Sequence, residues 1–193
     1  MVEHEADDAM AAAAIRAAAD PRVGTVNICT PDKDLAQVVD DVVGIAQVDR
    51  RKDVVYDRAG VVEKFGVEPA SIPDWLALVG DAADGIPGLP GWGAKSASKV
   101  LARYGHLEEI PDDPSSWDVA VRSANRLAAT LVERCDEALL YRRLATLDLN
   151  APVMDDVEEL RWSGPADHLE AVCAHLDASR VAERARRLAA ERT

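Results

Sequence analysis

Seven carboxylates in three short clusters constrain this chain more than any other feature. Each cluster lies where a helix or strand is expected to begin or end, and carboxylates repel one another unless a cation joins them. Taken singly, each cluster is also typical of helix caps and turns, but the three together favour a site for hard divalent ions such as Mg²⁺. The clusters are Glu5, Asp7 and Asp8; Asp32 and Asp34; and Asp81 and Asp84.

The first half of the chain alternates between helical and strand patterns, which indicates an α/β fold with a parallel component. An alanine-rich stretch over residues 5–19 predicts a helix that Asp20-Pro21 ends, with acids in the first turn where the helix dipole favours them. Strands are expected over residues 23–29, 42–48 and 53–56, and helices over residues 33–39, 58–65 and 72–79.

The second half reads as helical. Helices are expected over residues 93–104, 121–146 and 167–190, with a loop at 111–116 and a strand-like segment at 147–153. We therefore predict two domains. Residues 1–84 form an α/β domain that carries the clustered carboxylates, and residues 85–193 form a helical subdomain.

Composition limits the class of protein. The chain has 193 residues, of which 48% are apolar, so it can form a folded core. Its apolar runs are too short for a membrane span and its N-terminus is acidic, so we expect a cytoplasmic protein with no membrane partner. The cysteines lack the spacing of a zinc site or a disulfide framework, and we expect buried thiols at Cys29, Cys135 and Cys173.

A turn with three glycines opens a basic helix and indicates contact with phosphate. Glycine lets the backbone approach a ligand, the start of a helix attracts anions, and basic residues recur every four positions along one face. The alternative is a tight helical hairpin with solvated lysines. Because the 22 basic and 35 acidic residues leave a net charge of −13, DNA binding would depend on this local patch and weaken with salt. The candidate DNA-binding residues are Gly88, Gly91, Gly93, Lys95, Ser96, Lys99 and Arg103.

Four segments resemble the 5′-3′ exonuclease and flap endonuclease family, especially the bacterial type fused to DNA polymerase I. They are EADD at 5–8, TPDKDLAQ at 30–37, VEKFGV at 62–67 and IPDWLALVGDAADGIPGLPGWGAKSA at 72–97. The resemblance covers nearly the whole chain and implies a partial parallel sheet of PIN-like type, followed by a helix-hairpin-helix (helix-three-turn-helix) element at 85–104.

The resemblance also implies chemistry and ligands. All seven clustered carboxylates would bind two divalent ions, Mg²⁺ or Mn²⁺, with Asp8, Asp32, Asp34 and Asp81 as the catalytic residues. The glycine turn would hold branched or 5′-ended duplex DNA, often with a K⁺ bound by backbone carbonyls. Two-metal hydrolysis needs no protein nucleophile, since metal-bound water attacks phosphorus.

Family members begin with a strand that bears a metal-binding Asp in an Asp-Gly motif, followed by a basic helical arch. This chain begins at the EADD segment. We therefore expect that about a third of the nuclease domain is missing, through a misassigned start, a split gene whose partner polypeptide supplies the rest, or loss in a remnant.

Two hypotheses stay open at this point. The first is a Mg²⁺-dependent 5′-3′ exonuclease or flap endonuclease, active in a longer chain or with a complementing polypeptide. The second is a non-catalytic module that binds duplex DNA through the helix-hairpin-helix. A nuclease directed at RNA is a weaker third hypothesis, because the helix-hairpin-helix favours the backbone of duplex DNA.

Overall fold

The computed structural model describes residues 3–191. The chain divides into two compact units, one up to Val153 and one from Met154 onward. The predicted division at residues 84 and 85 stays a prediction. Within the described residues, no helix has both the length and the apolar character needed to cross a bilayer.

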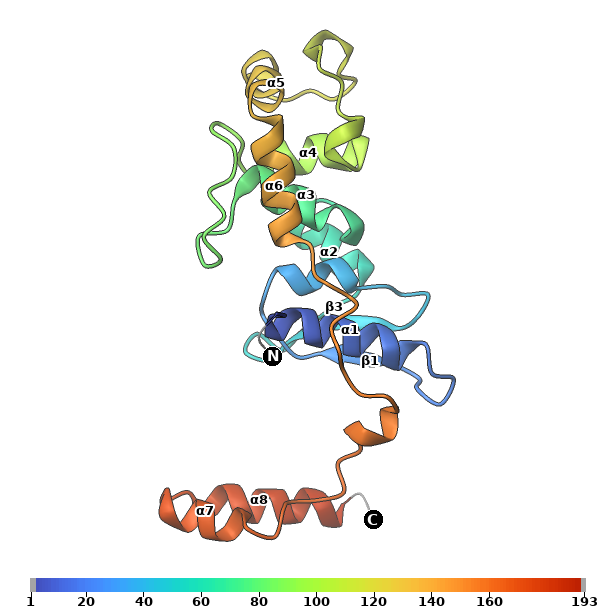
Figure 1. Ribbon diagram of the computed structural model, residues 1–193, viewed down its shortest axis with the longest axis vertical. Helices are drawn as coiled ribbons and strands as arrows, with labels where there is room; N and C mark the ends of the chain where they lie inside the picture. The colour runs from blue at the N-terminus through green and yellow to red at the C-terminus, as the bar shows by residue number, and fades with distance from the viewer. Residues whose placement is uncertain (1–2, 192–193) are drawn as a thin grey trace. The chain divides into compact units, whose positions relative to one another are not determined.

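A small mixed sheet forms one layer of the first unit, as Figure 1 shows. Its strands are β1 (Val26–Ile28), β2 (Ile45–Asp49) and β3 (Val54–Tyr56), in the order β1-β2-β3. The β1 and β2 strands are parallel, with Val26 opposite Ile45, which confirms the predicted parallel component. The β2 and β3 strands are antiparallel, with Val48 opposite Val55.

Helix α1 (Ala6–Ala18) packs against this sheet through its alanines. Ala11 and Ala14 are almost fully buried against Ile28 and Ile45. Small side chains let the helix axis approach the strands closely, so burial here depends on close packing rather than on bulky residues. The predicted helix over residues 5–19 is confirmed.

The larger core lies among the helices of the first unit. Leu76 and Leu78 of α3 are fully buried in it, with Val100 and Leu101 of α4. Figure 1 shows α6 running beside α3. The helices are α2 (Arg58–Phe65), α3 (Ile72–Val79), α4 (Ala94–Tyr104), α5 (Ala124–Glu133) and α6 (Cys135–Ala145).

A buried carboxylate joins α3 to α6. Asp74 is 2% exposed and accepts hydrogen bonds from Arg142 Nη1 at 3.1 Å and from His106 Nδ1 at 2.8 Å. Arg142 also donates to Glu108 Oε2 at 2.6 Å, and this contact lowers the pKa of Glu108 to about 2. The buried charge is therefore paired and hydrogen-bonded, which a buried carboxylate requires.

Two predictions about local structure were wrong. The segment after α6, expected as a strand over residues 147–153, is not a strand, because side chains satisfy its backbone: Leu147 N donates to Gln37 Oε1 and Asp148 N donates to Asp8 Oδ1. The cysteines were expected to be buried, but Cys29 and Cys135 are exposed and only Cys173 is buried.

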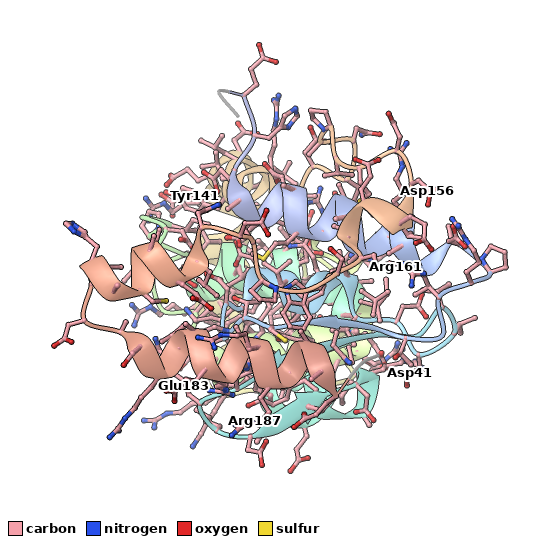
Figure 2. All side chains as sticks on the ribbon, turned by 90° about the horizontal axis from the view of Figure 1, so that it is seen from below. Asp41, Tyr141, Asp156, Arg161, Glu183 and Arg187 are labelled. Carbon is pink, nitrogen blue, oxygen red and sulfur yellow. The ribbon has the colours of Figure 1, made fainter. Side chains whose placement is uncertain are left out.

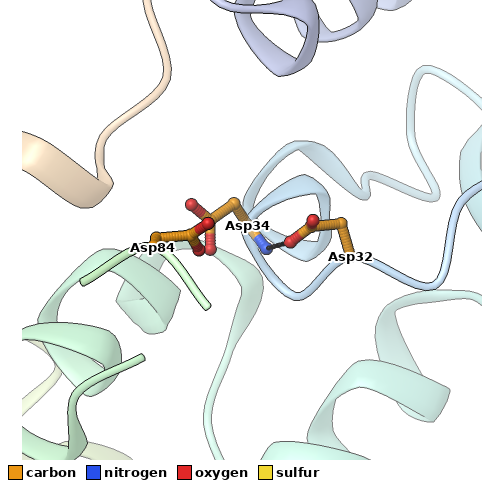
Figure 3. A group of neighbouring side chains, drawn as sticks. All are labelled: Asp32, Asp34 and Asp84. Carbon is orange, nitrogen blue, oxygen red and sulfur yellow. Dashed lines mark hydrogen bonds between the residues drawn. The ribbon is translucent and has the colours of Figure 1, made fainter. Parts of the chain in front are cut away.

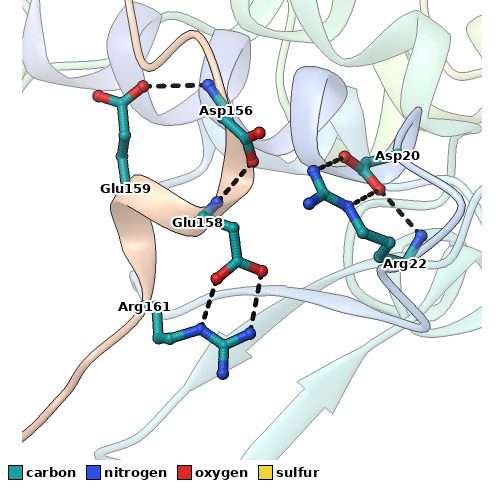
Figure 4. Close-up of polar contacts among 6 residues, drawn as sticks. All are labelled: Asp20, Arg22, Asp156, Glu158, Glu159 and Arg161. Carbon is teal, nitrogen blue, oxygen red and sulfur yellow. Dashed lines mark hydrogen bonds and ion pairs between the residues drawn. The ribbon is translucent and has the colours of Figure 1, made fainter.

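In its described residues, 154–191, the second unit holds two helices and one 3-10 turn. They are η5 (Val157–Leu160), α7 (Leu169–His175) and α8 (Ser179–Ala190). Figure 4 shows how η5 is capped: Glu158 N donates to Asp156 Oδ1 and Arg161 pairs with Glu158. On α8, Glu183 and Arg187 lie one turn apart (Figure 2).

The turn between α1 and β1 is closed by a local ion pair. The Arg22 guanidinium donates to Asp20 Oδ2 at 2.6 Å, and Arg22 N donates to Asp20 Oδ1 at 2.9 Å, as Figure 4 also shows. These bonds lower the pKa of Asp20 to about 2. The turn ends α1 where Asp20-Pro21 was predicted to end it.

Candidate metal centre and nucleic-acid interface

The loop that follows β1 carries Asp32 and leads into the 3-10 helix η1 (Asp34–Val38), whose first residue is Asp34. Gln47 holds this loop from the centre of the sheet. Its side chain is fully buried, and Nε2 donates to Thr30 O at 3.1 Å and to Asp32 O. Both carboxylates therefore lie at the carboxyl end of a parallel strand, where open α/β sheets place their ligands.

A short hairpin loop presents Asp81 and Asp84. Asp81 and Ile86 exchange two backbone hydrogen bonds of 2.8 Å, and Asp84 lies in the turn between them. A closed loop therefore holds the two carboxylates. Asp81 is 4% exposed and its Oδ1 accepts from Ala83 N at 3.1 Å, whereas Asp84 is exposed.

Asp32, Asp34 and Asp84 come together in space. One carboxylate oxygen from each lies within 4.8 Å of the other two (Figure 3). Burial, followed by the negative charges of Asp84, Asp32, Asp81 and Asp7, raises the pKa of Asp34 to about 7. Burial and the charges of Asp81 and Asp32 also raise the pKa of Asp84. The predicted convergence of the second and third clusters is thus present in the fold.

The buried oxygen of Asp34 tests whether this site fits a metal ion. Asp34 Oδ1 is shielded from solvent and has no hydrogen-bond partner in the described part of the chain. An unsatisfied buried carboxylate oxygen is costly, and beside two further carboxylates it matches the all-oxygen ligand set that Mg²⁺ and Mn²⁺ prefer. The residues present therefore fit a divalent ion.

Asp81 has a different partner. Its Oδ2 forms an ion pair with Lys33 Nζ, so this buried carboxylate is neutralised by a lysine that lies between Asp32 and Asp34 in the sequence. Lys33 was not predicted as a site residue, although its position between the two aspartates was the available signal. It supplies positive charge inside a strongly negative cluster.

The three N-terminal carboxylates differ in their surroundings. Burial, followed by the charges of Asp32, Glu5, Asp84 and Asp8, raises the pKa of Asp7, so Asp7 lies within electrostatic range of the cluster. Glu5 is exposed at the start of α1. Asp8 uses both oxygens in backbone hydrogen bonds, with Glu5 N at 2.9 Å and Asp148 N at 2.8 Å. The metal-binding roles of Glu5, Asp7 and Asp8 and the catalytic role of Asp8 stay predictions.

A groove of about 970 Å³, which we call the α4–α5 groove, lies beside the glycine turn. Five of the seven predicted DNA-binding residues line it: they are Gly91, Gly93, Lys95, Ser96 and Lys99. Sequence reasoning missed three basic residues of the same groove, Lys64, Arg122 and Arg126. Lys64 comes from α2, Arg126 from the first turn of α5 and Arg122 from the segment just before α5, and no motif connects these segments to the glycine turn.

Two predicted DNA-binding residues have structural partners elsewhere. Gly88 has φ +70°, and a Cβ there would lie 2.6 Å from Gly80 N, so this glycine lets the loop pack on the end of α3. Arg103 donates to Asp118 Oδ2 at 2.6 Å, and this bond raises the pKa of Arg103. Neither residue is among those that line the groove, and their contact with DNA stays a prediction.

Two family models match consecutive parts of the chain. The model described as 5′-3′ exonuclease, N-terminal resolvase-like domain, matches residues 1–66. The model described as 5′-3′ exonuclease, C-terminal SAM fold, matches residues 67–168. The two matches meet within the first unit, between α2 and α3.

Curated relatives agree with these models. A 5′-3′ exonuclease of Aquifex aeolicus is 46% identical over 85 residues, which are 44% of this chain and 29% of that protein. The DNA polymerase I of Pseudomonas aeruginosa is 38% identical over 164 residues, covering 81% of this chain and 17% of the polymerase. A 5′-3′ exonuclease of Streptomyces coelicolor is 38% identical over 149 residues, covering 74% of this chain and 45% of that protein. The chain thus spans less than half the length of these relatives.

Solved structures show the same fold. T5 5′-exonuclease with bound zinc superimposes with a TM-score of 0.60 at 20% identity, covering 75% of this chain and 51% of that one. T5 D15 flap endonuclease with DNA and metal ions superimposes with a TM-score of 0.56 at 22% identity, covering 76% of this chain and 50% of that one. From the matched family models and the shared fold, we conclude that the chain belongs to the 5′-3′ exonuclease family.

Proposed function

We propose that this chain is the metal-binding and DNA-binding part of a Mg²⁺-dependent 5′-3′ exonuclease or flap endonuclease. The observation that carries the proposal is the unpartnered buried oxygen of Asp34 beside the carboxylates of Asp32 and Asp84. This arrangement is unfavourable for a protein without a cation and suitable for one that holds a hard divalent ion. Membership of the 5′-3′ exonuclease family supports phosphodiester hydrolysis as the reaction in which that ion takes part.

In this proposal Asp32, Asp34 and Asp84 hold one divalent ion, and Asp7 and Asp81 help to hold a second. Bound Mg²⁺ or Mn²⁺ would supply a hydroxide nucleophile at neutral pH and stabilise charge on the scissile phosphate. Gln47 keeps Asp32 in place through the loop backbone. Lys33 limits the repulsion that Asp81 adds to the cluster.

The DNA partner is proposed from the α4–α5 groove and from the fold. A branched or 5′-ended duplex would be held at the glycine turn of a helix-hairpin-helix, formed by α3 and α4, with K⁺ as a further ligand of the turn. The outer edge of β1 pairs with no strand among the described residues, so a further polypeptide segment can add to the sheet beside the carboxylates.

Cleavage of a labelled 5′-flap duplex in Mg²⁺ tests this function. We expect shortened products with the wild-type chain, and none with EDTA or with Asp34→Asn. No described residue that lines the α4–α5 groove is a carboxylate, so the groove is formed without the metal-binding cluster. This favours a second candidate function, a DNA-binding module without nuclease activity. Retarded but uncut DNA in Mg²⁺ would favour that module. DNA that is neither retarded nor cleaved would contradict both candidate functions.

A further inference from the structure

Asp81 differs from the carboxylates around it, because it is already neutralised. After burial, its negative charge is among the causes that raise the pKa of Asp34 and of Asp84, so Asp81 lies within electrostatic range of both. It is nevertheless not one of the three residues whose oxygens converge within 4.8 Å. Of the seven clustered carboxylates, all of them among the described residues, Asp81 is the one that forms an ion pair with a basic side chain, and its partner is Lys33.

The ion pair uses the oxygens through which Asp81 could bind a metal. Asp81 is 4% exposed, its Oδ2 accepts from Lys33 Nζ, and its Oδ1 accepts from Ala83 N at 3.1 Å. In the same cluster, Asp34 Oδ1 is buried and has no hydrogen-bond partner in the described part of the chain. An oxygen is therefore open for an ion at Asp34, whereas at Asp81 an ammonium group takes the place that a second ion would need.

The Lys33 side chain can leave Asp81 while the backbone stays in place. The side chain is 41% exposed, and the Lys33 carbonyl oxygen accepts from Ala36 N at 3.0 Å, which fixes the backbone of the loop. Asp81 cannot follow the lysine, since its backbone exchanges two hydrogen bonds of 2.8 Å with Ile86. An ammonium group on a flexible stem reaches water readily, whereas the buried carboxylate that it leaves then needs another cation.

Lys33 and a second metal ion cannot occupy this place together. Both are positively charged, and like charges that share one site disfavour each other. The charge of Lys33 also reaches Asp84, where it opposes a rise in pKa that burial and neighbouring aspartates cause. A divalent ion carries twice the charge of an ammonium group, so an exchange of Lys33 for the ion adds positive charge to an acidic cluster.

We propose that Lys33 competes with the second metal ion for Asp81. In the metal-free protein its ammonium group occupies Asp81, and the second ion binds there as the Lys33 side chain moves out into solvent. The ion at Asp32, Asp34 and Asp84 needs no such exchange and binds first. Lys33 is thus a positioning residue that acts through Asp81 and sets how tightly the second site is filled. The inference rests on the proposed two-metal function and deepens it.

Calorimetric titration of the full chain with Mn²⁺ at pH 8 tests this competition. We expect the wild type to bind one ion tightly and a second ion more weakly. Lys33→Met should bind the second ion about tenfold more tightly, because no ammonium group has to be displaced. Lys33→Arg keeps the charge and should bind the second ion as the wild type does. Lys52→Met is the matched control, since it removes a lysine that is paired with Asp49, outside the seven clustered carboxylates, and should leave both affinities unchanged.

Urea unfolding provides a readout that distinguishes competition from a purely structural role of Lys33. Competition predicts that Lys33→Met has a lower urea midpoint than the wild type in EDTA. Saturating Mn²⁺ should remove this difference, because the ion then neutralises Asp81 in both proteins. A purely structural ion pair would give the same difference in EDTA and in Mn²⁺. If Lys33→Met does not fold in EDTA, the comparison is made with Lys33→Gln, whose amide can still donate to Asp81.

The outcomes separate this inference from the proposed function. Unchanged affinity for the second ion in Lys33→Met, or a difference in urea midpoint that persists in Mn²⁺, would overturn the competition while the metal centre stands. Tighter binding of the second ion by Lys33→Arg would also overturn it, because that variant keeps the competing charge. One bound ion in both the wild type and Lys33→Met would remove the second site and leave the site at Asp32, Asp34 and Asp84 in place. Absence of Mn²⁺ binding by the wild type would contradict the proposed function itself.

Discussion

Lys33 is ion-paired with the buried carboxylate of Asp81 inside a cluster that otherwise consists of negative charges. Asp81 receives one backbone hydrogen bond, from Ala83 N, so the lysine is its main source of compensation. The pair explains how the metal-free protein tolerates the buried carboxylate of Asp81 beside Asp32, Asp34 and Asp84.

Removal of Lys33 should therefore destabilise the metal-free protein. We expect Lys33→Met to lower the free energy of unfolding in EDTA by about 1–2 kcal/mol, less than for a fully buried pair because Lys33 is 41% exposed. Lys52→Met is the matched control. Its partner, Asp49, also accepts two backbone N–H groups, so the loss should be smaller. Equal urea midpoints for the two variants would contradict the account.

The pKa of Asp34 predicts a pH dependence of stability. It rises from 3.8 to about 7 on folding, so between these values the folded state binds a proton that the unfolded state lacks. The free energy of unfolding in EDTA should therefore fall as the pH rises from about 4 to about 7, by an amount on the order of 2–4 kcal/mol.

Asp34→Asn should remove this slope of the free energy of unfolding against pH. Without metal, the variant should be more stable than the wild type at pH 8. Urea unfolding at pH 5 and pH 8 measures both effects. Glu183→Gln, an exposed carboxylate on α8, is the control and should keep the wild-type slope. A slope that survives in Asp34→Asn would mean that another group carries it.

Gly85, in the hairpin loop that presents Asp84, and Gly88, which follows that loop, should respond differently to substitution. A Cβ at Gly88 would lie 2.6 Å from backbone atoms of Gly80 and Val79, whereas a Cβ at Gly85 would meet nothing within 4 Å. Both have positive φ, +70° and +72°. We expect Gly85→Ala to cost about 1–2 kcal/mol for its φ alone, and Gly88→Ala about 3 kcal/mol or more. Similar melting temperatures for the two variants would contradict the packing role of Gly88.

Much of the fold could be predicted from local signals. The predicted bounds of α2 and α3 match the structure, because each helix has clear end signals: Asp57 caps α2, whose end at Gly66 has φ +74°. The strand expected over residues 147–153 failed because its hydrogen bonds go to side chains from distant segments, which no local pattern reveals.

The candidate site was predictable only in part. Carboxylates at element ends indicated Asp32, Asp34 and Asp84, and the structure brings them together. Lys64, Arg122 and Arg126 were missed because separate segments of the chain form the lining of the α4–α5 groove, and the proximity of these segments is a property of the tertiary fold.

A calorimetric titration with Mn²⁺ tests the central claim most directly. Because a divalent ion must displace the proton of Asp34, the wild-type chain should bind Mn²⁺ more tightly at pH 8 than at pH 6. At 100 times Kd, bound metal should add about 2.7 kcal/mol to the free energy of unfolding. Asp34→Asn should lose this binding and Glu183→Gln should keep it. Equal Mn²⁺ affinity in the wild type and Asp34→Asn, or no binding by either, would contradict a metal centre at these carboxylates.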